Sequence, residues 1–173
     1  MNLLLVFLFM ANADSTHAKP AFSAKTPAFK YGEWIPSKYT CMGKDISPRI
    51  VFKNVPKNAK SIAIIADDPD APMGTWVHWV IYNIPPDSEH IPEAFPKKMK
   101  VGKICQGKND FGKYGYGGPC PPGGVHRYFF KIYILDTVFE CQKKMDKETL
   151  LKLMKGHIIA QDTIMGRFGK VKM

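Results

Sequence analysis

Residues 61–72 read SIAIIADDPDAP, a run of small and β-branched apolar residues that ends in three carboxylates and two prolines. The apolar part has the length and composition of a buried β-strand, and its lack of alternation is typical of a strand covered on both faces. The two prolines then fix a rigid turn directly after the strand. This stretch therefore predicts a central strand that delivers acidic side chains to one edge of a sheet.

Similar runs elsewhere in the chain extend this prediction to a mostly β domain. β-Branched and aromatic residues dominate residues 50–52, 75–83 and 126–135, and residues 158–168 can form a returning strand. Their near-continuous apolarity also predicts central strands covered on both faces. One helix is expected, with Asp146 as N-cap, Leu150, Leu151, Leu153 and Met154 on one face, and Gly156 after its end.

The N-terminal segment predicts an exported protein. An apolar run at residues 3–9 is too short to span a bilayer as a helix, but it suits the core of a signal peptide. The small residues of Thr16-His17-Ala18 favour cleavage after Ala18. This gives a signal peptide at 1–18, a linker at 19–28 and one domain at 29–173. The protein would then be secreted or periplasmic. The alternative is that the first residues form a buried strand.

The charge restricts partners only weakly. The chain has 25 Lys and Arg against 15 Asp and Glu, a formal net charge of +10, so negative partners are attracted at low salt. The lysines are scattered and no nucleic-acid-binding motif accompanies them, so no nucleic acid is expected. A membrane-surface contact remains an alternative that rests on this charge.

Four cysteines form an even set, Cys41, Cys105, Cys120 and Cys141. In an exported protein such a set permits one or two disulfides, and small buried thiols are the equal alternative. No C-x-x-C motif occurs, so we expect no metal site and no cofactor.

Two segments carry polar groups of the kind that build a binding site. The carboxylates of Asp67–Asp70 follow a buried strand and need partners, which caps in a simple turn could also supply. The loop at residues 114–124 is rich in glycine and proline, so its backbone N–H groups can face a ligand, and His126-Arg127-Tyr128 follows at once. No phosphate-binding motif of the Walker or dinucleotide type is present.

These segments together resemble the phosphatidylethanolamine-binding protein family, in its bacterial Raf-kinase-inhibitor-like branch. The similarity lies in Asp68-Pro69-Asp70-Ala71-Pro72, in Trp76-Val77-His78, in Gly118-Pro119 and in Gly124–Tyr128, in that order. Thr40-Cys41, Ile46–Pro48 and Gln106–Gly112 look like the bacterial branch. The resemblance covers about residues 29–168.

The resemblance implies a two-sheet antiparallel β-sandwich with a few peripheral helices, and an anion pocket at one end. Carried over by position, the ligand-binding residues are Asp68, Asp70, His78, Gly118, Pro119, His126 and Tyr128. Pro72 belongs to the structural motif, with cis peptide bonds expected at Ala71–Pro72 and at Gly74–Thr75. Arg127 is expected as a buried partner of a carboxylate.

The function implied is non-enzymatic binding of a small phosphate-type or zwitterionic head group, in which both histidines donate to the anion. Inhibition of a kinase or a protease, and a homodimer, are implied by the family. The alternative is a hydrolase that acts on a phosphoester or acyl substrate through an Asp/His pair, although no nucleophile stands out, since Ser47 lacks a G-x-S-x-G context.

Overall fold

The structure, a computed structural model, describes residues 20–169. Nine strands, one α-helix and one 3-10 helix are found in this range. In chain order they are β1 (Ser23–Lys25), η1 (Ser37–Tyr39), β2 (Ile50–Lys53), β3 (Ser61–Asp68), β4 (Trp76–Ile84), β5 (His90–Ile91), β6 (Lys100–Val101), β7 (Ile104–Gln106), β8 (Val125–Leu135), α1 (Lys147–Met154) and β9 (Ile158–Gly169).

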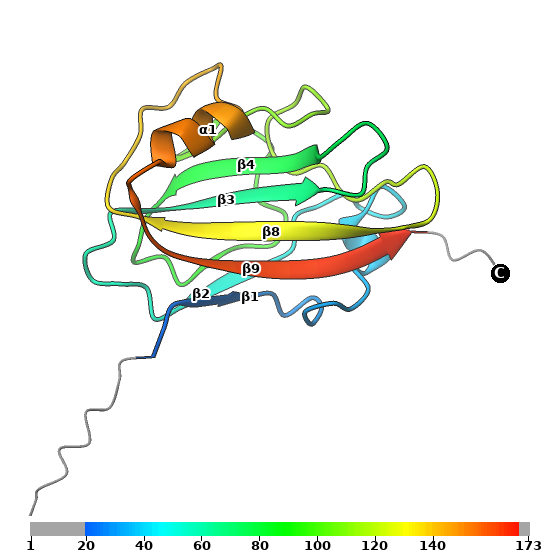
Figure 1. Ribbon diagram of the computed structural model, residues 1–173, viewed down its shortest axis with the longest axis horizontal. Helices are drawn as coiled ribbons and strands as arrows, with labels where there is room; N and C mark the ends of the chain where they lie inside the picture. The colour runs from blue at the N-terminus through cyan, green and yellow to red at the C-terminus, as the bar shows by residue number, and fades with distance from the viewer. Residues whose placement is uncertain (1–19, 170–173) are drawn as a thin grey trace, which may run out of the picture.

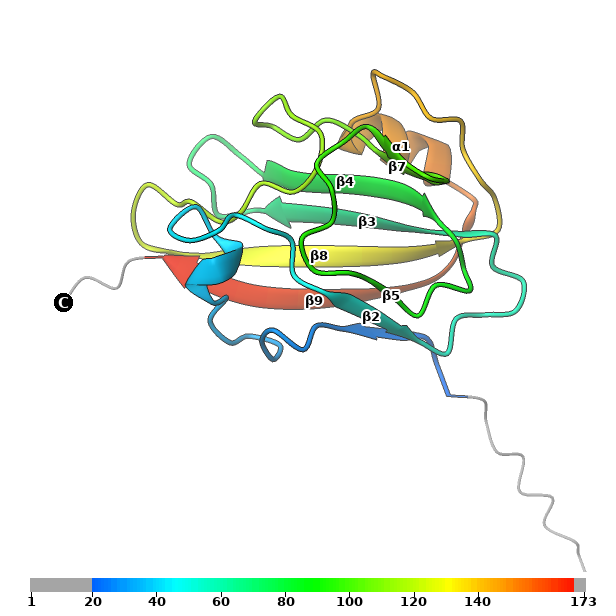
Figure 2. The ribbon, with the colours of Figure 1, turned by 180° about the vertical axis from the view of Figure 1, so that it is seen from behind.

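The strands form two antiparallel sheets, and the predicted fold class is confirmed. The larger sheet has the order β6-β7-β4-β3-β8-β9, and the smaller has the order β1-β2-β5. In the larger sheet, β4, β3, β8 and β9 lie side by side in Figure 1, with α1 along one side. Figure 2 shows β2 and β5 of the smaller sheet in front of the opposite face.

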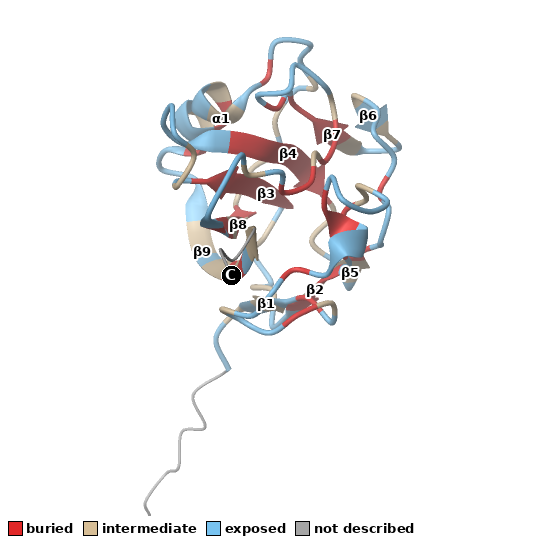
Figure 3. Cartoon of the chain, turned by 90° about the vertical axis from the view of Figure 1, so that its right-hand side faces the viewer, coloured by how far each residue is buried: buried red, intermediate tan, exposed pale blue. Residues whose placement is uncertain are grey.

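β3 shows how the sequence sorts its side chains between two cores. Because side chains alternate along a strand, Ile62 and Ile64 enter the core between the sheets, whereas Ala63 and Ile65 enter the core beneath α1. Every residue of β3 is buried, as predicted for a strand covered on both faces. In the view of Figure 3 the buried residues of β3 and β4 lie inside the molecule.

β8 departs from this prediction. Its even-numbered residues from His126 to Ile134 are buried, but the odd-numbered ones from Val125 to Tyr133 are exposed or half-buried. Its second face is covered only in part, so the aromatic side chains of Phe129 and Tyr133 lie at the border with solvent. Aromatic residues at every second position made a one-sided strand look two-sided.

α1 begins and ends as predicted. The Asp146 carboxylate accepts a hydrogen bond from the Thr149 N–H at 2.8 Å, and Gly156 takes the left-handed conformation with φ 84° after the helix. Leu150 and Met154 are buried against the sheet. Leu151 is exposed, because a single helical face against a flat sheet has room for fewer residues than the pattern suggested.

The N-terminal segment is more ordered than a linker. β1 lies within residues 19–28 and pairs with β2 at Ala24 and Phe52, so the folded unit extends into the expected linker. The expected signal peptide at 1–18 lies outside the described residues. Within residues 20–169, no helix has the length and apolar character needed to cross a membrane.

All four cysteines are joined in disulfides. Cys41 pairs with Cys120 and Cys105 pairs with Cys141, with Cα–Cα distances of 5.4 and 5.7 Å. Of the two alternatives that the sequence left open, the structure has the disulfides. The first bridge connects the η1 region to the glycine- and proline-rich loop.

Candidate functional site

Four of the predicted site residues come together at one end of the core between the sheets. β3 ends at this edge of the large sheet, whereas β4 and β8 begin there, because neighbouring strands are antiparallel. Asp68, His126 and Tyr128 follow the same alternation that directs Ile64 and Phe130 into that core. With His78 of β4 they line a cavity of about 190 Å³.

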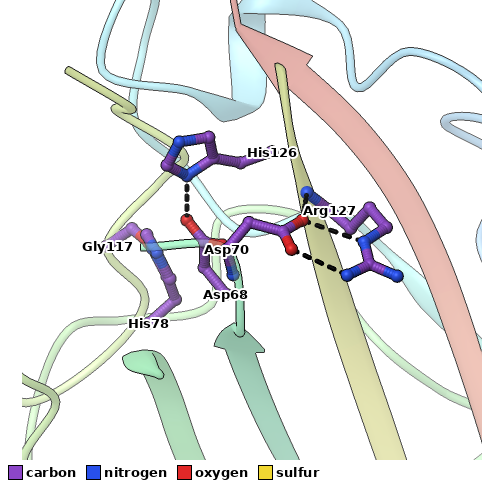
Figure 4. Close-up of polar contacts among 6 residues, drawn as sticks. All are labelled: Asp68, Asp70, His78, Gly117, His126 and Arg127. Atoms are coloured by element: carbon purple, nitrogen blue, oxygen red, sulfur yellow. Dashed lines mark hydrogen bonds and ion pairs between the residues drawn. The ribbon is translucent and has the colours of Figure 1, made fainter. Parts of the chain in front are cut away.

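His126 and Asp68 form a buried pair in this cavity (Figure 4). The His126 Nδ1 lies 2.8 Å from the Asp68 Oδ2, and both residues are almost fully buried. The other carboxylate oxygen of Asp68 accepts the N–H of Asp70 at 2.8 Å. The carboxylate therefore fixes Nδ1 of the imidazole as a donor and leaves Nε2 for a ligand.

His78 is held by the glycine-rich loop. Its Nδ1 donates to the carbonyl oxygen of Gly117 at 2.6 Å, and its ring packs edge-on to Tyr128 with centroids 5.2 Å apart. Burial lowers the pKa of His78 below the usual value for histidine. The neutral ring with a proton on Nδ1 presents Nε2 as an acceptor, so the prediction that His78 donates to an anion requires that the bound anion protonates this ring.

Tyr128 contributes a hydroxyl group without a partner. It is buried, and among the described residues no group forms a hydrogen bond with it. Burial raises the pKa of Tyr128, as do the charge of the Asp68 carboxylate and a side-chain contact with it that lies outside hydrogen-bond geometry, so the hydroxyl keeps its proton and is a hydrogen-bond donor. A buried donor of this kind is rare in a folded protein and marks a place where a ligand or a water molecule can bind.

Asp70 turns away from the cavity toward Arg127. The Arg127 guanidinium donates to both Asp70 oxygens at 2.9 and 2.7 Å, and the Arg127 backbone N–H adds a third bond (Figure 4). These hydrogen bonds lower the pKa of Asp70 to about 2. Arg127 does pair with a carboxylate, but its side chain is 53% exposed and not buried as predicted, because β8 has only one fully covered face.

The glycine-rich loop lines the cavity with different residues from those we predicted. Gly118 donates its N–H to Asp45 at 2.6 Å, and the Pro119 carbonyl accepts from Cys41. These backbone groups are used within the protein. The wall of the cavity is made by the three residues that follow, Cys120, Pro121 and Pro122.

Pro72 lies at the cavity as expected, but the peptide bond before it does not have the expected cis geometry. Within residues 20–169 no peptide bond is cis, so the predictions for Ala71–Pro72 and Gly74–Thr75 are wrong. The turn closes instead by a bond from the Gly74 N–H to the Ala71 carbonyl at 3.1 Å, with Gly74 at φ 101°. A trans bond before proline is also the form of lower energy.

Two aromatic residues at the cavity were missed by the sequence analysis as site residues. Trp76 and Phe111 pack edge-to-face with centroids 5.4 Å apart, and both are part exposed at the rim. Their place beside His78 and within the segment at 106–112 was the available signal. Within residues 20–169, no group of three or more His, Cys, Asp or Glu side chains is arranged to hold a metal ion.

Comparisons with known proteins identify the family of this chain. The profile of the family described as phosphatidylethanolamine-binding protein matches residues 25–169. A UPF0098 protein of Methanothermobacter thermautotrophicus is 49% identical over 146 residues, covering 83% of this chain and 96% of its own. The crystal structure of a putative phosphatidylethanolamine-binding protein homologue from Chlamydia trachomatis has a TM-score of 0.81 at 41% identity and covers 87% of this chain and 99% of its own.

A more distant structure has the same fold. E. coli YbcL, described as a new member of the mammalian family, has a TM-score of 0.80 at 28% identity, with 88% of this chain and all of its own chain covered. The match to the family profile spans most of the chain, including every residue of the cavity. The chain therefore belongs to the phosphatidylethanolamine-binding protein family, a family of binding-type proteins.

Proposed function

We propose that the protein binds a compact phosphate-type anion, free or as the head group of a small zwitterion, in the cavity of Asp68, His78, His126 and Tyr128. The observation that supports this most directly is the unpaired Tyr128 hydroxyl beside the His126–Asp68 pair. A buried polar group without a partner costs about 1–3 kcal/mol, and a ligand acceptor at this place would recover that free energy.

The polar groups of the cavity suit a phosphate that still carries a proton or an amine. Tyr128 donates, protonated His126 donates through Nε2, and neutral His78 accepts through Nε2. The Asp68 carboxylate accepts from Nδ1 of His126 and so leaves Nε2 for the ligand. A phosphate monoanion has both acceptor oxygens and one O–H, and phosphoethanolamine replaces that O–H with an ammonium group.

The size of the cavity favours a small ligand. Its volume of about 190 Å³ is below the roughly 300 Å³ at which pockets for drug-sized molecules begin. Trp76 and Phe111 provide apolar surface at the rim, where a short organic arm would leave the cavity.

Calorimetric titration with inorganic phosphate and with phosphoethanolamine tests the proposal. We expect His126→Asn to weaken binding by about ten- to a hundredfold, since asparagine can keep the bond to Asp68 but lacks Nε2. Tyr128→Phe should weaken it about fivefold. Arg127→Gln is the matched control, because Arg127 points away from the cavity and should leave affinity unchanged. Unaltered affinity in both cavity variants, or no binding by the wild type, would refute the proposal.

Two of the remaining functional predictions, inhibition and hydrolysis, depend on this site. Inhibition of a kinase or protease would follow if the bound anion belonged to a target protein, and export, a homodimer and a membrane-surface contact stay predictions. Turnover of phosphomonoesters or esters that is lost in His126→Asn would favour the hydrolase alternative, with Asp68 and His126 as its acid–base pair.

A further inference from the structure

A second cavity lies directly behind one wall of the first. It has about 200 Å³, close to the volume of the first cavity, and its lining includes Asp45, Lys97, Lys113 and Gly117. None of the residues that we predicted to bind the ligand lines it except Gly118.

The two cavities share a thin wall. Phe111 lines both of them, and its ring lies against Gly117, where an added Cβ would come within 2.6 Å of the ring. The disulfide also borders both, with Cys120 in the first cavity and Cys41 in the second. His78 in the first cavity bonds to the carbonyl of Gly117 in the second.

Part of the wall between the cavities is exposed to solvent. Phe111 is 41% exposed, and the Cys41 and Cys120 residues that flank it are also exposed. A ligand held in the first cavity can therefore extend over the Phe111 ring without a change in the protein core.

The second cavity has positive charge that the fold does not use. Lys97 is paired with Asp45 at 2.8 Å, and Asp45 also accepts the Gly118 N–H, so these two charges compensate each other. Lys113 is exposed and forms no ion pair within residues 20–169. Its backbone N–H is fixed by the buried Asn109 side chain at 3.0 Å, which holds the lysine at this rim.

We propose that the second cavity is a subsite for a second acidic group, and that the protein selects elongated ligands with a phosphate-type group at one end and a carboxylate or phosphate at the other. This proposal rests on the proposed function of the first cavity. The phosphate-type group occupies the first cavity, the chain of the ligand crosses Phe111, and the second acid pairs with Lys113. The first cavity already contains the Asp68 carboxylate, whereas the lining of the second cavity includes Lys113, which has no ion-pair partner within residues 20–169.

A series of ω-phosphonocarboxylic acids with two to ten methylene groups measures the span between the subsites. Each acid is compared with its ω-carboxamide by calorimetry at low salt, because exposed charges are screened at higher ionic strength. The ratio of the two affinities should be near one for the shortest acids and rise to about two- to fivefold once the chain crosses the wall, as for an exposed ion pair.

Lys113→Gln should return the ratio to one at every length and leave the affinity for inorganic phosphate unchanged. Lys57→Gln is the control, because Lys57 is also exposed but lies before β3, at the far end of the sheet from both cavities. A ratio of one at all lengths in the wild type, or a raised ratio that survives in Lys113→Gln, would overturn the subsite while phosphate binding still supports the first cavity. If inorganic phosphate itself does not bind, both proposals fail.

Discussion

Asp67 and Asp68 are neighbours on β3 and both are buried, but they lie on opposite faces of the sheet with different partners. Asp67 faces α1, and one of its oxygens accepts from Lys131 at 2.9 Å and from Lys147 at 2.5 Å. Asp68 faces the cavity and pairs with His126. The alternation of a β-strand thus gives two identical residues two different environments.

The partners decide what each carboxylate can do. Lysine keeps its charge across the physiological pH range, so the Asp67 pair is a fixed part of the fold. Histidine can change its charge in that range, so the Asp68 pair can respond when a ligand binds. The difference makes Asp68, and not Asp67, the candidate for a role in binding.

The largest expected effect separates the two residues by stability. Asp67→Asn leaves two lysines without their carboxylate, and we expect it to lower the free energy of unfolding by about 2 kcal/mol, less than for a fully buried pair because Lys131 is 36% exposed. Asp68→Asn should cost only about 1 kcal/mol, since neutral His126 can still donate to the amide oxygen. Urea unfolding at pH 7 measures both.

A second measurement on the same variants is the affinity for sulfate, a probe of the anion cavity. Asp67→Asn should leave this affinity unchanged because Asp67 does not line the cavity. A larger loss of stability for Asp68→Asn than for Asp67→Asn would reverse the comparison. So would a loss of sulfate binding in Asp67→Asn.

The next effect concerns protons. A bound anion favours the imidazolium form of His126, so sulfate binding at pH 7 should take up a fraction of a proton, at most about one. Sulfate is the probe because it does not titrate near neutral pH, and it tests the donors Tyr128 and His126 although it has no O–H for His78. Calorimetry in two buffers of different ionisation enthalpy gives the uptake, which Asp67→Asn should retain and His126→Asn should lose. Equal uptake in the wild type and in His126→Asn would rule out His126 as the group that responds.

The sequence predicted the parts of the site that depend on strand alternation. Once residues 61–68 and 126–135 are strands, Asp68, His126 and Tyr128 follow from their place in the alternation, and the family resemblance adds His78. The buried face of β3 and the cap of α1 followed from local patterns of the same kind. The sequence did not predict the pairing of the cysteines, because that pairing depends on contacts between distant loops.

The predicted site residues that lie outside the cavity are in turns and loops, where no periodicity fixes the direction of a side chain. Asp70 was expected in the cavity, but the turn after Pro69 directs it to Arg127. Gly118 was expected to donate to a ligand, but the distant Asp45 takes its N–H. The orphan hydroxyl of Tyr128 and the second cavity depend on side chains from several elements, so no single segment of sequence indicates them.

The smallest expected effect tests His78, the second imidazole of the cavity, by the pH dependence of stability. Its pKa is lowered in the folded protein by burial, so the unfolded chain binds a proton more readily. The stability that the neutral ring contributes is complete above the unfolded pKa of about 6.5 and is lost as the pH falls from there toward the lower folded pKa.

His78→Asn can keep the bond to Gly117 but cannot titrate, so its free energy of unfolding should fall less between pH 7.5 and 5 than that of the wild type. The carboxylate of Asp70, with its pKa near about 2, stays ionised throughout this window and does not contribute to the difference. Urea unfolding at several pH values gives the two curves. Parallel curves would show that His78 does not titrate differently in the folded and unfolded states, and its assignment as a neutral acceptor would then fail.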